Sequence, residues 1–158
     1  MGLEGEALEE VVRGAELHDV GKMAVPDEIL HKPGALTAEE WGFIRRHTII
    51  GERILAAAPA LTGVARLVRA SHERWDGNGY PDGLEGGRIP LGARIIAVCD
   101  AFDAMTSERP YSEPMSAQDA VEELWRCAGG QFDPAVVAAF AAEVTGGRVR
   151  PRGVDQPA

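Results

Sequence analysis

The spacing of the apolar residues constrains the fold of this chain more than any other feature of its sequence. They recur at steps of three and four, which places them on one stripe of an amphipathic helix. One such stripe consists of Leu8, Val11, Val12 and Ala15. The sequence shows no strand-like alternation of any length and no internal repeat. It therefore predicts an all-α fold.

Start and stop signals divide the chain into separate helices. Thr37 and Glu40 form a capping box, in which a hydroxyl and a carboxylate satisfy reciprocal backbone donors. Ser116 is a favourable N-cap, and Asp133 followed by Pro134 is typical of a helix start. The expected helices run from Glu6 to Leu17 with Gly21 closing the first, from Thr37 through Leu55, from Pro59 to about Glu73, from Leu91 to about Ser107, from Ser116 to Gly129, and from Asp133 to Gly146.

The segment from Arg74 to Pro90 differs from the rest of the chain because glycines make regular structure unfavourable there. These glycines are Gly77, Gly79, Gly83, Gly86 and Gly87. Long loops in compact domains are usually functional or disordered, and the embedded side chains of Trp75, Tyr80 and Ile89 favour order. The sequence therefore predicts an ordered functional loop.

Composition excludes several classes of partner. The 158 residues fit one globular domain, and 16 Lys and Arg against 25 Asp and Glu give a net charge of −9. A protein that coats DNA, RNA or an anionic membrane needs a basic face, so these partners are not expected. A small ligand with localised charge is compatible with the composition.

No stretch reaches the roughly 18 apolar residues of a membrane span, and the acidic N-terminus lacks the features of a signal peptide. Cys99 and Cys127 lie in apolar helical patterns outside any CxxC motif, so we expect small buried hydrophobic side chains. A cytoplasmic, reducing compartment is the expectation.

Three of the four histidines lie at or near carboxylates on separate expected helices, and Asp100 lies on a fourth helix. They are His18 beside Asp19, His47, and His72 beside Glu73. Imidazole and carboxylate groups suit divalent ions, and a carboxylate can bridge two of them to activate water for attack on phosphorus. A histidine at a helix end can also simply cap carbonyls, so spacing alone leaves both interpretations open.

The sequence segments around these residues resemble those of a known protein family. The segments are Leu17–Lys22 (LHDVGK), His47 followed by Gly51, Ser71–Pro81 (SHERWDGNGYP), Asp100–Thr106 (DAFDAMT), Arg109–Tyr111 (RPY) and Gln131–Pro134 (QFDP). In this order they resemble the HD-GYP family, from about Leu17 to Phe140. The resemblance implies an HD-domain helical bundle with a glycine-rich GYP loop. Its members are bacterial metal-dependent phosphodiesterases that open the ring of cyclic di-GMP.

The resemblance also implies roles for individual residues. The implied metal ligands are His18, Asp19, His47, His72 and Asp100, and Asp19 would bridge two ions. Asp19 and Lys22 are the implied catalytic residues, with Lys22 facing the scissile phosphate. The implied substrate-binding residues are Lys22, Gly79, Tyr80, Pro81, Asp103 and Arg109.

Purely structural or surface roles are alternative interpretations for several of these residues. Lys22 could be a solvated surface residue, and Tyr80 could pack under the loop. Asp103 could orient a ligand rather than contact the nucleotide, and Glu73 fits a supporting role better than a catalytic one. We expect core packing for Trp41 and Trp125, leave Trp75 open, and expect His31 on the surface.

Two departures from the family pattern matter. Ser71 stands where the family usually has a histidine, and the family's histidine upstream of His18 lies before this chain begins. We therefore expect an N-terminally truncated HD-GYP domain over residues 1–147, a flexible tail over 148–158, and an exposed apolar face carrying Leu8, Val11 and Val12. The ion at His18, Asp19 and Asp100 should bind tightly. The ion at His47 and His72 should bind weakly.

The resemblance implies hydrolysis of cyclic di-GMP to linear pGpG or GMP with one or two divalent ions. Iron or manganese is favoured, and zinc or nickel is compatible. One alternative is a degenerate module that binds cyclic di-GMP or a diguanylate cyclase (GGDEF) domain without turnover. Another is a general HD hydrolase acting on mononucleotides, which the GYP loop disfavours. An upstream sensory or receiver domain and a homodimer are further expectations.

Overall fold

The protein is described by a computed structural model over residues 1–108 and 113–146. In these ranges the regular structure is helical, and the one β-bridge joins Ala128 to Phe132. This confirms the predicted all-α fold. The α-helices are α1 (Gly5–Leu17), α2 (Asp27–Leu30), α3 (Ala38–Arg45), α4 (His47–Ala56), α5 (Thr62–Ala70), α6 (Leu91–Thr106), α7 (Ala117–Arg126) and α8 (Pro134–Val144). Three 3₁₀ turns join them, namely η1 (Val20–Ala24), η2 (Pro59–Leu61) and η3 (Gly86–Arg88).

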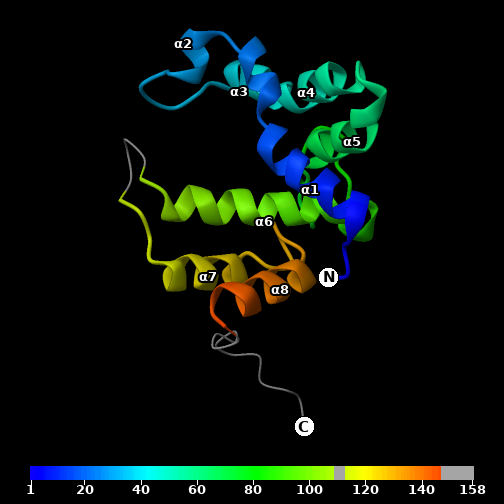
Figure 1. The fold of residues 1–158 in the computed structure, drawn as a ribbon. Coiled ribbons are helices and arrows are strands. Elements are labelled where there is room, and N and C mark those ends of the chain that lie inside the picture. Colours follow the sequence, from blue (N-terminus) through cyan, green and yellow to red (C-terminus); the bar gives the residue numbers. More distant parts are fainter. Residues whose placement is uncertain (109–112, 147–158) are drawn as a thin grey trace.

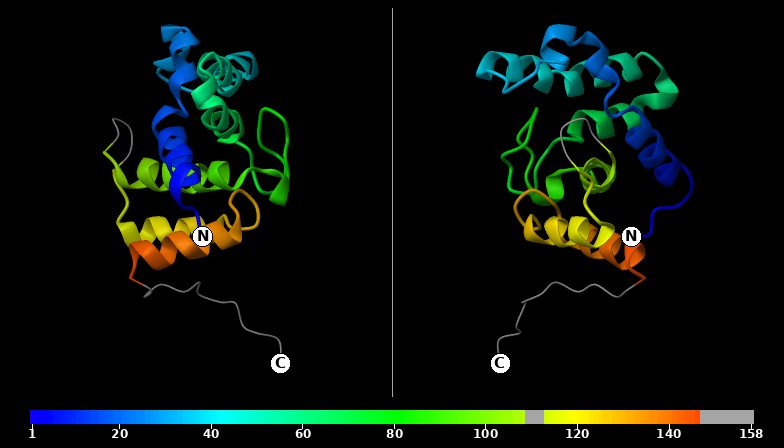
Figure 2. Two further views of the ribbon diagram at one scale, coloured as in Figure 1. Left: turned by 45° about the vertical axis from the view of Figure 1, so that its right-hand side comes forward. Right: turned by 90° about the vertical axis from the view of Figure 1, so that its left-hand side faces the viewer.

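Helix α6 runs through the middle of the molecule (Figure 1). Helices α1 and α5 pack against it from one side, and α7 and α8 from the other. Helix α4 packs on α5 and on η1, so the segment after α1 is held against the start of α4. The loop between α5 and α6 protrudes on one side of the bundle in both views of Figure 2.

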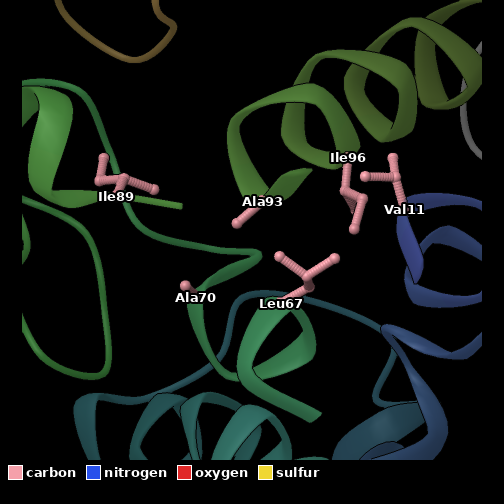
Figure 3. Packing of buried hydrophobic residues seen from close by; sticks show 6 residues of the cluster. All are labelled: Val11, Leu67, Ala70, Ile89, Ala93 and Ile96. Atoms are coloured by element: carbon pink, nitrogen blue, oxygen red, sulfur yellow. The ribbon is translucent and has the colours of Figure 1, made fainter. Parts of the chain in front are cut away.

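A hydrophobic cluster joins α1, α5 and α6. Leu67 of α5 points toward Ala93 and Ile96 of α6 and toward Val11 of α1 (Figure 3). Ile89, two residues before the start of α6, closes the same cluster from the loop side. Each fully buried aliphatic side chain of this kind contributes roughly 1.5–3 kcal/mol to stability. The cluster therefore holds together the three helices that carry or flank the site.

A second cluster joins α6 to α7 and α8 through Val98, Leu124, Phe132, Val136 and Val137. Trp125 packs against it, which confirms the core packing predicted for that residue. Asp133 caps α8 by accepting a hydrogen bond from the Ala135 amide, and its other oxygen accepts one from Arg94 of α6 at 2.7 Å. The C-terminal helices are thus fixed to the central helix by both apolar packing and an ion pair.

The capping signals at Thr37, Ser116 and Asp133 are confirmed. The predicted helix from Thr37 through Leu55 is wrong, because the chain breaks at Arg46 into α3 and α4. The Arg46 amide bonds to the Phe43 carbonyl, which tightens the last turn of α3 and interrupts the α-helical hydrogen-bond pattern there.

The predicted extension of the third helix to Glu73 is also wrong, since α5 ends at Ala70. The Ser71 amide bonds to Val68 in a tightened final turn, and His72 therefore lies in the loop. Helix α1 ends at Leu17 as predicted, and the short helix α2 was not predicted.

Gly21 explains why η1 can lie against α4. A Cβ atom on Gly21 would fall 1.9 Å from the His47 carbonyl oxygen and 2.7 Å from the Gly51 amide nitrogen. No side chain fits at that distance, so glycine is required for the close approach. This approach brings Asp19, just before η1, next to His47.

The prediction that Trp41 packs in the core is wrong, because its side chain is 46% exposed. Leu8 and Val12 are exposed, as expected for the apolar face of α1, whereas Val11 is buried against α5 and α6. No residue of α3 is fully buried, and Ile44 is only partly buried.

Cys99 and Cys127 are free thiols and only partly buried. Over the described residues, no helix combines the length and apolar character needed to cross a bilayer. The tail expected over residues 148–158 lies outside the described residues, as does Arg109.

Candidate metal centre

Four segments bring the predicted ligands together. His18 and Asp19 follow the end of α1, His47 begins α4, His72 lies just after α5, and Asp100 lies on α6. His18 Nε2 is 3.6 Å from Asp19 Oδ2 and 3.5 Å from Asp100 Oδ1. His47 Nε2 is 3.5 Å from Asp19 Oδ1. The five side chains that the sequence singled out thus converge on one site.

The ring orientation of two histidines suits metal binding. Nδ1 of His18 lies 2.8 Å from the Ala15 carbonyl oxygen, and Nδ1 of His47 lies 2.6 Å from that of Ile44. A carbonyl only accepts, so Nδ1 carries the proton in both rings and donates it. In the neutral form of either ring the lone pair is then on Nε2, which in His47 faces Asp19 and in His18 faces both Asp19 and Asp100.

Three atoms at the centre of the site are buried without a hydrogen-bond partner among the described residues: Asp19 Oδ1, His47 Nε2 and His72 Nε2. One ligand atom from each of the three residues lies within 4.8 Å of the others. Buried polar atoms normally have partners, so an unpaired trio of two imidazole nitrogens and a carboxylate oxygen needs an explanation. A divalent ion would satisfy all three at once, and the donor set fits one.

The protonation states agree with this fit. Burial lowers the pKa of His72 to about 4, and burial also lowers the pKa of His47 below its usual value. Both rings are therefore neutral near pH 7, as metal ligands must be. His18 differs, because its hydrogen bond to Asp100 raises its pKa and the same bond lowers the pKa of Asp100.

The most compact group is therefore Asp19 with His47 and His72, which we expected to be the weaker position. His18 and Asp100 instead pair with each other across the site. Asp19 joins the two halves, since Oδ1 faces His47 and Oδ2 faces His18. Its geometry is compatible with the bridging role that the resemblance implies.

Lys22 Nζ donates a hydrogen bond to Asp19 Oδ2 at 2.6 Å. The lysine is thus held at the site rather than being a freely solvated surface residue. Ser71, in contrast, is 2% exposed and donates its hydroxyl proton to the Val68 carbonyl oxygen. It is engaged with the end of α5 and does not replace a histidine ligand.

Glu73 organises the glycine-rich loop. Its buried carboxylate accepts hydrogen bonds from the amides of Asp82 and Leu84, so the loop folds back over the end of α5. Gly79 permits this path, because a Cβ atom there would lie 2.3 Å from the Arg74 amide nitrogen. The supporting role expected for Glu73 agrees with these contacts.

A cavity of about 350 Å³ opens beside His72 and Asp100. Gly79 and Tyr80 line it, whereas Pro81 is not among its lining residues. The Tyr80 ring stacks on the His72 ring with centroids 5.2 Å apart and planes 15° apart. Burial raises the pKa of Tyr80 to about 12, so its hydroxyl stays protonated. Tyr80 is both a cavity wall and a support for His72.

Trp41 and Arg45 of α3 also line this cavity, and no motif in the sequence pointed to them. The available signal was their i, i+4 spacing just before His47. Asp103 lies in a separate cavity of about 200 Å³ together with His18 and Cys99, and Ser107 donates a hydrogen bond to it. His31 is exposed, as predicted.

Comparison with known proteins agrees with this geometry. Residues 1–136 match the model of the HD domain family. The chain is 45% identical over 142 residues to a cyclic di-GMP phosphodiesterase of Thermotoga maritima, covering 89% of this chain and 39% of the relative. It is 42% identical over 138 residues to the 3'3'-cGAMP-specific phosphodiesterase 2 of Vibrio cholerae, covering 86% of this chain and 26% of the relative.

The fold resembles the crystal structure of a cyclic GMP-AMP specific phosphodiesterase of Vibrio cholerae. The TM-score is 0.71 at 19% identity, over 93% of this chain and 40% of that one. The chain thus spans 39% or less of the length of the two curated relatives described above.

Proposed function

The chain belongs to the HD domain family, within its HD-GYP group, and from that premise we propose that it is a metal-dependent phosphodiesterase acting on a cyclic dinucleotide. One observation carries the proposal. The buried, unpaired ligand atoms of Asp19, His47 and His72 lie beside a cavity that His72 itself lines. A metal-ligand set that opens directly onto a ligand cavity is the arrangement that hydrolysis of a bound phosphodiester requires.

The residues present can hold a divalent ion through Asp19, His47 and His72, and His18 with Asp100 can complete a second position. A bound divalent ion would polarise a phosphoryl oxygen and lower the pKa of a water molecule. Iron or manganese is the proposed ion, since both accept mixed imidazole and carboxylate ligands, and zinc or nickel is compatible.

The chain's own side chains would act together with the bound ion. Lys22, held by Asp19, places a cation where negative charge grows on the phosphoryl group. Tyr80 holds the His72 ring in position by stacking and lines the cavity. Gly79 and Pro81 shape this loop, and contacts of Asp103 and Arg109 with the nucleotide are further parts of the proposal.

The proposed substrate is cyclic di-GMP, opened to linear pGpG or hydrolysed to GMP. Curated relatives are named as cyclic di-GMP and 3'3'-cGAMP phosphodiesterases, and both compounds contain guanine. The cytoplasmic location, the diguanylate cyclase partner, the upstream sensory or receiver domain and the homodimer stay predictions.

The test is chromatographic product analysis with cyclic di-GMP, without oxygen, in the presence of ferrous iron or manganese. The unaltered chain should form product, and His72→Ala should abolish product because it removes a ligand. His31→Ala is the matched control, since His31 is exposed and distant in sequence from every ligand. Retained binding of cyclic di-GMP without product under any metal would contradict the proposal and favour the degenerate module.

A further inference from the structure

Two side chains of α3 reach the cavity although they belong to none of the motifs. Trp41 and Arg45 are four residues apart, so they lie on one face of the helix. Both line the cavity beside the metal ligands. The neighbouring Phe43 and Arg46 do not line it and instead contact each other, with the guanidinium 5.4 Å from the ring centroid. One face of α3 is therefore directed to the site.

Arg45 is close to the metal centre through a stack of side chains. Its guanidinium carbon lies 5.5 Å from the centroid of the Tyr80 ring. The Tyr80 ring in turn stacks on His72. The cation is thus separated from a candidate metal ligand by one aromatic ring.

Within residues 1–108 and 113–146, no carboxylate forms a salt bridge with Arg45, and the side chain is exposed. The other arginine that lines the cavity, Arg74, is already held by both oxygens of Asp76. In a chain with a net charge of −9, most basic groups could find an acidic neighbour. The Arg45 guanidinium keeps its donors available for an anionic oxygen.

A cyclic dinucleotide presents two phosphodiester groups on opposite sides of its ring. Only one can be at the metal ligands, so the second carries a negative charge into a site that already contains Asp19 and Asp100. Resting on the proposed function, we propose that Arg45 binds the phosphate that is not cleaved, and that the exposed ring of Trp41 packs on the adjoining base. Together they form the α3 subsite of the cavity.

The test compares two substrates, two variants of the subsite with a matched control for each, and one conservative variant of Arg45. Cyclic di-GMP has two phosphodiester groups, whereas bis(p-nitrophenyl) phosphate has only one. Arg45→Ala should raise the KM for cyclic di-GMP by about 10-fold or more with a much smaller change in kcat, because a charge-assisted contact to the bound substrate is lost. The loss in kcat/KM should be at least about fivefold larger for cyclic di-GMP than for the smaller ester.

Trp41→Ala should show the same preference for cyclic di-GMP, and Arg45→Lys should recover part of the loss because it keeps the charge without the planar fork. Phe43→Ala on α3 and Arg46→Ala at its C-cap are matched controls, because neither residue lines the cavity. Metal content and thermal unfolding of each variant exclude a general disturbance of the fold.

Calorimetric titration with cyclic di-GMP separates this proposal from the proposed function. A Kd raised by about 10-fold in Arg45→Ala supports the α3 subsite even if the unaltered chain forms no product. An unchanged Kd and KM in Arg45→Ala would overturn it. Equal losses on both substrates would also overturn it, since the residue would then act on the scissile phosphate or on Tyr80.

Discussion

Asp19 is the residue on which the candidate metal centre should depend most, because its two carboxylate oxygens face different groups. Oδ1 is buried without a partner beside His47, while Oδ2 lies against Lys22 and His18. Removing this carboxylate removes the common point of both halves of the site. It also removes an acceptor that no hydrogen bond satisfies in the described protein.

Asp19→Ala should therefore lose metal binding and hydrolysis while keeping the fold. The free energy of unfolding of the metal-free protein should change by less than about 1 kcal/mol, because the side chain is partly exposed and its ion pair with Lys22 is solvated. Metal analysis and thermal unfolding check the two parts. Normal metal content in this variant would remove Asp19 from the centre.

At this scale the sequence identified the side chains that the folded chain brings together, but not their surroundings. His18, Asp19, His47 and His72 lie in or beside recognisable motifs, so their convergence on one site could be expected, and their role as ligands stays a prediction. The partners of the ring nitrogens could not, because they are backbone carbonyls of residues that no pattern distinguishes. Trp41 was misassigned because an apolar residue on a helix does not reveal whether another element covers it.

The helices and the turns between them determine how the ligands are aimed. His47 is buried at the first residue of α4, directly after the break at Arg46, and Asp19 lies next to it because η1 packs against α4. The existence of most helices was predictable from periodicity and capping residues. The break at Arg46 was not, since neither proline nor glycine marks it and only backbone hydrogen bonds of the folded chain define it.

The contact between η1 and α4 leads to a prediction about Gly21. Gly21→Ala should destabilise the protein by roughly 1–3 kcal/mol and weaken metal binding, because the new Cβ would collide with the His47 backbone. Urea unfolding and a metal titration measure both effects. Gly42→Ala on α3 is the control, since a Cβ atom there meets nothing within 4 Å.

The control should leave metal binding unchanged and stabilise the protein by up to about 1 kcal/mol through helix propensity. Similar losses for Gly21→Ala and Gly42→Ala would mean that the close approach of η1 and α4 does not position the ligands.

For the molecule as a whole, the site makes folding depend on pH when no metal is bound. The lowered pKa of His72, about 4, and of His47 mean that the folded state favours neutral rings. Their contribution to stability is fully present above the unfolded pKa of 6.5 and is lost as the pH falls toward about 4. His18 acts in the opposite sense, because its raised pKa gives a contribution that is present below 6.5 and lost as the pH rises through its folded value.

Below pH 6.5 the contribution of His18 is already fully present and no longer changes, so His72 and His47 alone should make the metal-free chain lose stability between pH 6.5 and about 4. Urea unfolding of chelated protein at about pH 7 and about pH 5 measures the difference. His72→Ala should show a smaller decrease, since it lacks the most strongly shifted ring. An equal decrease in this variant would assign the pH dependence to other groups.

At the scale of the whole molecule, the family motifs predicted the fold but not every part of the cavity. The motifs predicted an HD-type bundle, and the family match over residues 1–136 confirms it. The α3 subsite could not be predicted from those motifs, because Arg45 acquires its place only when α3 packs beside the loop that carries Tyr80. The net charge of −9 likewise did not indicate that an arginine would be left without an acidic partner at a ligand cavity.

We propose that ions held by Asp19, His47 and His72 enable this chain to hydrolyse a cyclic dinucleotide. The most direct test of this claim is the rate of cyclic di-GMP hydrolysis by one sample before chelation, after removal of metal, and during anaerobic titration with manganese or ferrous iron. We predict that activity disappears with the metal and returns in proportion to the ion bound. Chelated, metal-free protein that hydrolyses cyclic di-GMP at the original rate would contradict the claim.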